Sequence, residues 1–303
     1  MSLSRRQFVA RTAAATVALS FASPLANASP FESASGRRRA DFLPIRRGVG
    51  AFTDRGGTIG YLQQPDALVA VDAQFPDSAR AFLDGLEGSA RGLDLLVNTH
   101  HHGDHTAGNA VLAPVAARHV AHVAVPGLQR ASAVRSGSLD AQRYPSETFE
   151  RTWSAEVGDE VVALHYFGPA HTCGDAVVHF ERADVVHTGD LVFNHRQPYI
   201  DAGAGALTTG WIGVLEAIHD RFSDGTAFIF GHAGEGWPVV GTRADLLTMR
   251  DFLSALNAAV AARLAAGETA EQMVDMTIPG FEDWGPTPMR VVEPVVAEQQ
   301  AGR

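Results

Sequence analysis

"NTHHHGDHTAGN", residues 98–109, places four histidines and one aspartate within six consecutive positions. The segment follows an apolar run, "LDLLVNTH" (93–100), which predicts a short buried strand that ends at the first histidine. A rigid strand end suits metal ligands, because their positions must be fixed closely. Side chains alternate along an extended chain, so we expect His100 and His102 to share one ion.

The second half of this segment carries two further donors. Gly103 permits a sharp bend, after which Asp104 and His105 could face a second ion. Imidazole and carboxylate donors without a thiolate suit zinc, and also iron or manganese. The segment alone could be a solvated polar turn, an adventitious metal-binding tract or half of a metal site, and the rest of the chain has to decide.

Three more donors follow apolar runs elsewhere in the chain, each close to a glycine. His171 lies in "HYFGPAHTCGD", Asp190 follows Gly189 in "DVVHTGDLVF", and His232 ends "AFIFGH". Strand ends that carry such residues can converge at one edge of a sheet. Seven candidate ligands are thus present in the whole sequence.

The remaining pattern predicts strands and helices in two successive groups. Apolar and alternating runs predict strands over 48–63, 67–73, 152–157, 160–168, 175–182, 184–193 and 227–232. Helical spacing predicts helices over 76–88, 208–222, 242–267 and 268–276. The tail after Pro279 is expected to be broken by prolines. This order favours two sheets flanked by helices.

The motif Thr-His-x-His-x-Asp-His (99–105), with the later His, Asp and His, resembles that of the metallo-β-lactamase superfamily. The resemblance covers residues 45–235. It implies an α/β fold, the four-layer αββα sandwich, with metals at one edge of its two sheets. It also implies that His101, at the variable position of the motif, points away from the metals.

The resemblance further implies a ligand set and a reaction. The first metal would be held by His100, His102 and His171, the second by Asp104, His105 and His232, with Asp190 between them. Two Zn²⁺ ions, or iron or manganese, would supply a metal-bound hydroxide at neutral pH. Asp104 would orient that hydroxide as a catalytic residue. The reaction expected is hydrolysis of a small ester, lactone, thioester or amide.

Residues around this centre can also be assigned expected roles. The segment "NHRQPYIDAG" (194–203) follows Asp190 closely, and in it His195, Arg196 and Tyr199 are candidates for substrate binding. Arg196 could pair with a substrate carboxylate. Asp72, at the end of a predicted strand, is expected either to orient a ligand histidine or to cap its strand.

Composition limits the classes of partner. The chain has 303 residues, a formal net charge of -10, no lysine and a single cysteine, Cys173. Nucleic-acid binding needs a concentrated positive face and is not expected. The expected partner is a small-molecule substrate, and the oligomeric state is left open.

The N-terminus predicts export. "SRRQFVA" (4–10), an alanine-rich apolar stretch and "ANA" (26–28) resemble a twin-arginine signal peptide over residues 1–28. This predicts a contact with the twin-arginine translocase and a periplasmic or secreted location. Residues 29–43 would then be a linker, and residues 44–303 a single domain with C-terminal helices.

Three alternative functions remain open. A mononuclear-iron sulfur dioxygenase of the same fold would use His100, His171 and Asp190. A β-lactamase fits the compartment, although Asp190 departs from the usual lactamase ligand sets. A metal-binding accessory protein without turnover is the third. Glutathione-thioester hydrolysis is less expected, because only Arg290 and Arg303 follow Gly267 as basic residues.

Overall fold

The computed structural model describes residues 41–302. The predicted signal peptide (1–28) and most of the predicted linker (29–43) lie outside the described residues. The last three residues of that linker instead begin the first strand, which starts at Asp41. Phe42 explains this earlier start, because its ring packs on Phe52 and Tyr61 with centroids 4.8 and 5.5 Å away.

The described chain forms two large sheets and one two-stranded sheet. The first large sheet has the order β1-β2-β3-β4-β5-β6-β7, and the second has the order β15-β13-β11-β10-β9-β8. The short sheet pairs β12 with β14 in parallel. The strands are β1 (Asp41–Arg46), β2 (Val49–Thr53), β3 (Ile59–Gln63), β4 (Leu68–Val71), β5 (Leu95–Asn98), β6 (His119–His122), β7 (Glu147–Phe149), β8 (Thr152–Glu156), β9 (Val161–His165), β10 (Val177–Phe180), β11 (Val185–His187), β12 (Phe193–Asn194), β13 (Ala227–Ile229), β14 (His232–Ala233) and β15 (Val240–Gly241).

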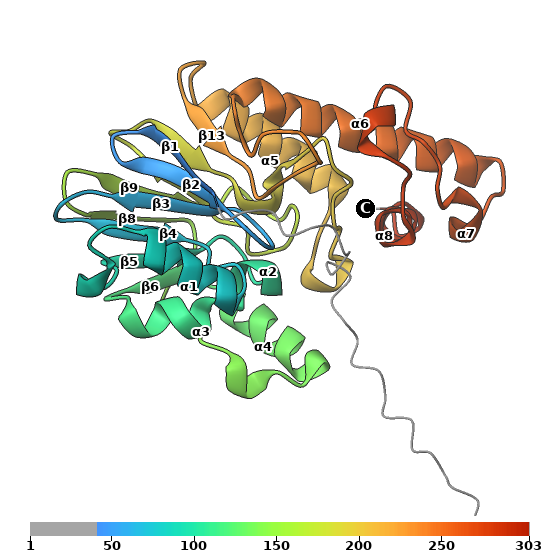
Figure 1. The fold of residues 1–303 in the computed structure, drawn as a ribbon. Coiled ribbons are helices and arrows are strands. Elements are labelled where there is room, and N and C mark those ends of the chain that lie inside the picture. Colours follow the sequence, from blue (N-terminus) through green and yellow to red (C-terminus); the bar gives the residue numbers. More distant parts are fainter. Residues whose placement is uncertain (1–40, 303) are drawn as a thin grey trace, which may run out of the picture. The chain divides into compact units, whose positions relative to one another are not determined.

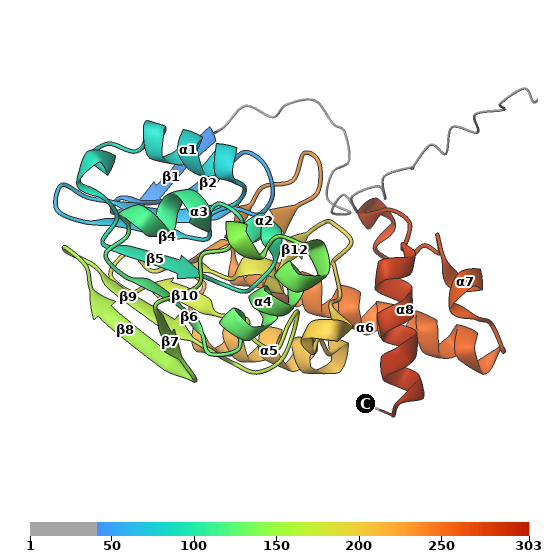
Figure 2. The same ribbon diagram turned by 90° about the horizontal axis from the view of Figure 1, so that it is seen from below.

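Helices cover the outer face of each large sheet, whereas the last α-helix packs against the longest one (Figures 1 and 2). The α-helices are α1 (Pro76–Gly85), α2 (Gly103–Thr106), α3 (Asn109–Leu112), α4 (Val125–Ser136), α5 (Thr208–Arg221), α6 (Arg243–Ala265), α7 (Ala270–Met273) and α8 (Met289–Gln300). None of the helices in the described part of the chain is long and apolar enough to cross a membrane.

Three apolar clusters separate the layers. The first lies between the sheets, where side chains such as Val69 and Val97 of one sheet meet Val178 and Phe180 of the other. The second joins the first sheet to α1 and α3, and the third joins the second sheet to α5, α6 and α8. The predicted four-layer αββα sandwich is therefore confirmed.

The C-terminal tail departs from the prediction. Residues 289–300 form α8 with Pro294 inside the helix. A helix-interior proline costs about 3 kcal/mol through the lost backbone hydrogen bond and its steric clash. Burial of a valine side chain contributes about 1.5 kcal/mol or more, and α8 buries Val291, Val292, Val295 and Val296. The free energy gained by burying these four valines therefore exceeds the cost of the proline.

Candidate metal centre

The loop after β5 carries the first four donor residues to the edge of the sandwich. His100 follows β5 by two residues, and His102 precedes the four-residue helix α2, which contains Asp104 and His105. The main chain at His102 is extended and turns helical at Gly103. The two pairs of side chains consequently point to two neighbouring places.

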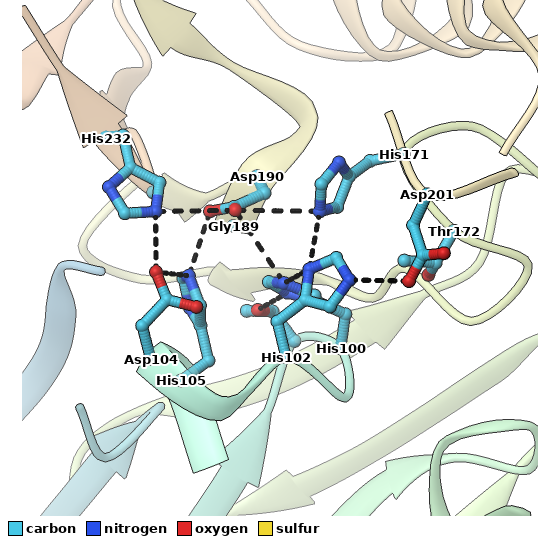
Figure 3. Close-up of polar contacts among 12 residues, drawn as sticks. His100, His102, Asp104, His105, His171, Thr172, Gly189, Asp190, Asp201 and His232 are labelled. Carbon is cyan, nitrogen blue, oxygen red and sulfur yellow. Dashed lines mark hydrogen bonds and ion pairs between the residues drawn. The ribbon is translucent and has the colours of Figure 1, made fainter. Parts of the chain in front are cut away.

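The ring nitrogens of His100, His102 and His171 meet in what we call the first cluster (Figure 3). The Nδ1 atom of His102 lies 3.0 Å from Nε2 of His100 and 3.0 Å from Nε2 of His171. The Oδ2 atom of Asp190 lies 3.7 Å from the His100 nitrogen and 3.6 Å from the His171 nitrogen. The predicted ligands of the first metal therefore face one another.

The second cluster consists of Asp104, His105 and His232 (Figure 3). The Oδ2 atom of Asp104 lies 3.1 Å from Nε2 of His232. Asp190 approaches both histidines, with Oδ1 3.0 Å from His105 Nε2 and Oδ2 3.4 Å from His232 Nε2. The structure thus brings all seven predicted residues together and places Asp190 between the two clusters.

Glycines permit this close approach. A Cβ atom on Gly231, which precedes His232, would collide with Oδ1 of Asp190. A Cβ atom on Gly57 would collide with the ring of His105, and the Gly57 amide donates to the carbonyl of Asp104 at 3.1 Å. These two positions need glycine because the donor side chains occupy the space.

Burial keeps two histidines of the first cluster neutral. Desolvation lowers the pKa of His100 well below its ordinary value and lowers the pKa of His171 to about 3. The neighbouring histidine rings act in the same direction. A neutral imidazole offers a lone pair, which is the form that binds a metal.

The second cluster is more strongly charged. Burial opposes ionisation, but the histidines outweigh it, and they lower the pKa of Asp104 to about 2 and that of Asp190 well below its ordinary value. Conversely, nearby carboxylates overcome burial and raise the pKa values of His105 and His232. Both carboxylates are therefore ionised at neutral pH.

The donor set fits divalent cations. The side-chain atoms that are buried without a hydrogen bond in the described part of the chain include Asp104 Oδ2, His105 Nε2 and Asp190 Oδ1, which approach one another as ion pairs. Unpaired buried polar atoms are costly. Two cations, coordinated by nitrogen and oxygen atoms in these clusters, would satisfy them.

Two further carboxylates each contact a histidine of the clusters, at the ring nitrogen that faces away from the cluster. Asp72 is expected from the sequence either to orient a ligand histidine or to cap its strand. Its carboxylate accepts a hydrogen bond from the Thr99 amide at 2.8 Å and lies 2.8 Å from Nδ1 of His105. Asp201 lies 2.9 Å from Nε2 of His102 and 3.6 Å from Nε2 of His101. His101 therefore lies outside the first cluster, on the side of Asp201.

Sequence reasoning missed Asp201. The residue lies two positions after Tyr199, in the segment 194–203 for which the sequence predicts substrate contacts. Burial opposes its ionisation, but hydrogen bonds to His101 and His102 outweigh this and hold the pKa of Asp201 well below its usual range. No spacing rule connects it to His102, which is 99 positions away.

The three predicted substrate residues lie at different places. The Nη1 atom of Arg196 is 3.4 Å from Nδ1 of His232, beside the second cluster. The ring of Tyr199 is 5.2 Å from that of His102, beside the first. His195 instead stacks on Trp237 with ring centroids 3.3 Å apart and makes a short hydrogen bond to Asp283.

Curated relatives match parts of the chain. The alpha subunit of 2,4-dinitroanisole O-demethylase from Nocardioides sp. is 28% identical over 177 residues, which is 56% of this chain and 51% of that protein. Hydroxyacylglutathione hydrolase from Gloeobacter violaceus is 33% identical over 123 residues, covering 39% of this chain and 42% of the enzyme. The Synechocystis sp. enzyme of the same name is 32% identical over 152 residues, with 48% and 54% covered. The chain spans about half the length of the curated relatives it matches.

Solved structures share the fold at low identity. A stereoselective inverting sec-alkylsulfatase from Pseudomonas sp. superposes with a TM-score of 0.64 and 15% identity, covering 86% of this chain and 50% of the other. A metallo-beta-lactamase from Pontibacter korlensis gives a TM-score of 0.58 and 17% identity, covering 71% and 99%. Residues 53–233, which include all seven donors, match the sequence profile of the metallo-beta-lactamase superfamily, and the chain belongs to that superfamily.

Proposed function

We propose that this protein is an exported dinuclear metal-dependent hydrolase of small ester, thioester, lactone or amide substrates. The superfamily consists mostly of metal-dependent hydrolases. One observation carries the proposal: seven donor side chains converge in two adjacent clusters that share Asp190. The nitrogen and oxygen donors favour zinc, with iron or manganese as the alternatives.

The residues of the chain have separable tasks in this reaction. Two bound divalent cations would supply Lewis acidity and a water of lowered pKa. Asp190, ionised and placed between the clusters, would offset the charge of both cations. The ionised carboxylate of Asp104, whose Oδ2 lies 3.1 Å from Nε2 of His232, can accept a hydrogen bond from the attacking water and so orient it.

Substrate recognition would use residues on the loop after β12. The guanidinium of Arg196, beside His232, is placed to pair with a carboxylate of the substrate. The ring of Tyr199, beside His102, offers an apolar surface with a polar end. These contacts favour small substrates that carry an acidic group.

Metal analysis combined with an activity panel tests this function. The purified protein is assayed for metal content and then with chromogenic esters, thioesters, lactones and nitrocefin, before and after treatment with a chelator. About two metals per chain and chelator-sensitive hydrolysis are expected. Asp190→Asn should lose both, whereas Asp84→Asn, an exposed carboxylate on α1, should retain both.

Other results would replace the proposal with a different function. About one iron per chain with oxygen uptake would identify the sulfur dioxygenase. Selective turnover of nitrocefin would identify a β-lactamase. Full metal loading with no turnover of any substrate in the panel would identify a metal-binding accessory protein.

We further propose export through the twin-arginine translocase to the periplasm or the cell exterior. The paired Arg5 and Arg6 before an apolar stretch support it. Changing both arginines to lysine should leave the precursor in the cytoplasm, as measured by cell fractionation and immunoblotting. Normal export of this double variant would show a different secretion route.

A further inference from the structure

His102 stands between two different environments, one for each ring nitrogen (Figure 3). Its Nδ1 atom faces the nitrogens of His100 and His171 at 3.0 Å each. Its Nε2 atom faces Oδ2 of Asp201 at 2.9 Å. A neutral imidazole carries one proton, so the partner of one nitrogen determines what the other can do.

The main chain holds Asp201 in position. Its Oδ1 atom accepts a hydrogen bond from the Ala204 amide at 3.1 Å and caps the short 3-10 helix Ala202–Ala204. The loop before it is joined to the C-terminal segment, because Gln197 Nε2 donates to the carbonyl of Gly285 at 2.9 Å. Asp201 Oδ2 is consequently a fixed acceptor directed at the histidines.

We propose that Asp201 is the positioning residue of the first cluster: its carboxylate accepts the Nε2 proton of His102 and leaves the Nδ1 lone pair directed toward His100 and His171. This inference rests on the metal site proposed above. A carboxylate behind a ligand histidine fixes both the tautomer and the orientation of the ring and increases its basicity. His101, 3.6 Å from the same oxygen, is a second neighbour of Asp201.

In the second cluster a carboxylate also contacts a histidine, but through Nδ1 of the ring instead of Nε2. Asp72 lies 2.8 Å from Nδ1 of His105, whose Nε2 faces Asp190. Each cluster therefore has one histidine backed by a carboxylate, and the two carboxylates come from different parts of the chain. Loss of the Asp201 carboxylate should therefore weaken the binding of one metal ion and leave the binding of the other unchanged.

A third cation, held by His101, His102 and Asp201, is the competing explanation of this group of donors. The 2.9 Å separation between Asp201 Oδ2 and His102 Nε2 is that of a charge-assisted hydrogen bond. Positioning explains this contact without a further ion. The stoichiometry of binding separates the two explanations.

Metal affinity of two variants tests the inference. Asp201→Asn keeps an oxygen that can cap Ala204 but removes the charge, and Asp201→Ala removes both. Zn²⁺ affinity is measured by competition with a chromogenic chelator, and site occupancy by the visible absorption of the Co²⁺-substituted protein. We expect one of two sites to weaken on the order of 10- to 100-fold, more in the alanine variant, with the other unchanged. Asp140→Asn, an exposed aspartate in the 3-10 helix Leu139–Ala141, is the matched control.

The wild-type protein gives a test that does not depend on the folding of a variant. Long-range ¹H–¹⁵N NMR of the Zn²⁺-loaded protein should show the His102 ring protonated at Nε2 with Nδ1 bound to metal. Protonation at Nδ1, wild-type affinity at both sites in Asp201→Asn, or three metals per chain would overturn the inference. Failure of the wild-type protein to bind metal at all would instead refute the proposed function.

Discussion

At the scale of single residues, Asp104 is the carboxylate that we expect to orient the attacking water. Its carboxylate is ionised, with a pKa of about 2, and Oδ2 lies 3.1 Å from Nε2 of His232. Asp104→Asn should preserve the fold, because the amide has the same shape. Turnover should fall on the order of a hundredfold or more, because the neutral amide cannot orient the attacking water as the carboxylate does. The measurement is kcat on the best substrate of the panel.

The control for this variant is Asp84→Asn, which changes an exposed aspartate of α1 in the same way. Circular dichroism and metal content of both variants would separate loss of fold or of metal from loss of chemistry. An Asp104→Asn protein that turns over at the wild-type rate would require a different group to orient the nucleophile.

His119 should make the stability of the protein depend on pH. The ring is buried and lies 2.7 Å from Oδ1 of Asn98, and burial lowers its pKa to about 4. The unfolded chain, with a histidine pKa of about 6.5, binds the proton more readily, so this contribution to stability is present above that pH and is lost as pH falls toward 4. The advantage of wild type over His119→Gln in unfolding free energy should shrink by about 2 kcal/mol between pH 7 and pH 5.

Urea unfolding of both proteins at the two pH values measures this change. Both proteins retain the other buried histidines, so the contributions of those residues cancel in the difference between the two unfolding free energies. A difference in unfolding free energy that stays constant across this pH range would mean that His119 is already protonated in the folded protein or free to leave its site.

The residues that the sequence identified share a local signal that Asp201 lacks. His100, His102, Asp104 and His105 occupy one short segment, and His171, Asp190 and His232 each follow an apolar run near a glycine. Asp201 contacts His102 only because the loop after β12 folds back across the first cluster. Which ring nitrogen of each histidine faces the cluster also depends on this three-dimensional arrangement.

At the scale of elements, strands and helices with strong periodicity were predictable, and short or context-dependent ones were not. Helix α5 runs from Thr208 to Arg221, close to the predicted 208–222, but the predicted helix over 268–276 reduces to α7, Ala270–Met273. The predicted strand over 184–193 divides into β11 and β12 because Asp190 turns the chain into the metal centre. Tertiary contacts, rather than local preference, decide these cases.

Helix α8 depends on one buried carboxylate. Glu298 accepts hydrogen bonds from the amides of Thr208 and Thr209 at 2.8 and 3.1 Å and from their hydroxyls at 2.8 and 2.7 Å. It thereby satisfies two of the free amides at the N-terminus of α5. Glu298→Ala should lower the unfolding free energy by about 3 kcal/mol, because buried donors lose a charged acceptor. Chemical denaturation measures this loss.

Glu293→Ala provides the control on the same helix, since Glu293 is exposed. Its unfolding free energy should stay within about 0.5 kcal/mol of the wild-type value. Equal losses in the two variants would show that the contact with α5 does not determine the effect.

At the scale of the whole molecule, the candidate metal centre joins the two halves of the sandwich. His100 to His105 follow a strand of the first sheet, whereas His171, Asp190 and His232 follow strands of the second. Bound cations would therefore link side chains from both sheets. Without them, buried carboxylates and imidazoles would face one another with unsatisfied atoms.

Metal removal should consequently lower the stability of the entire domain. A ligand that binds only the folded state, present at about a thousand times its dissociation constant, adds about 4 kcal/mol, so chelation should lower the midpoint of thermal unfolding by about 10 °C. The metal-loaded protein is heated with EDTA and, as the control, with EDTA saturated with Zn²⁺. Asp190→Asn should already unfold near the lower midpoint and respond little to the chelator. A wild-type midpoint that is unchanged by chelation, with loss of metal verified by elemental analysis, would show that the clusters are folded and stable without cations and that the two sheets do not depend on them.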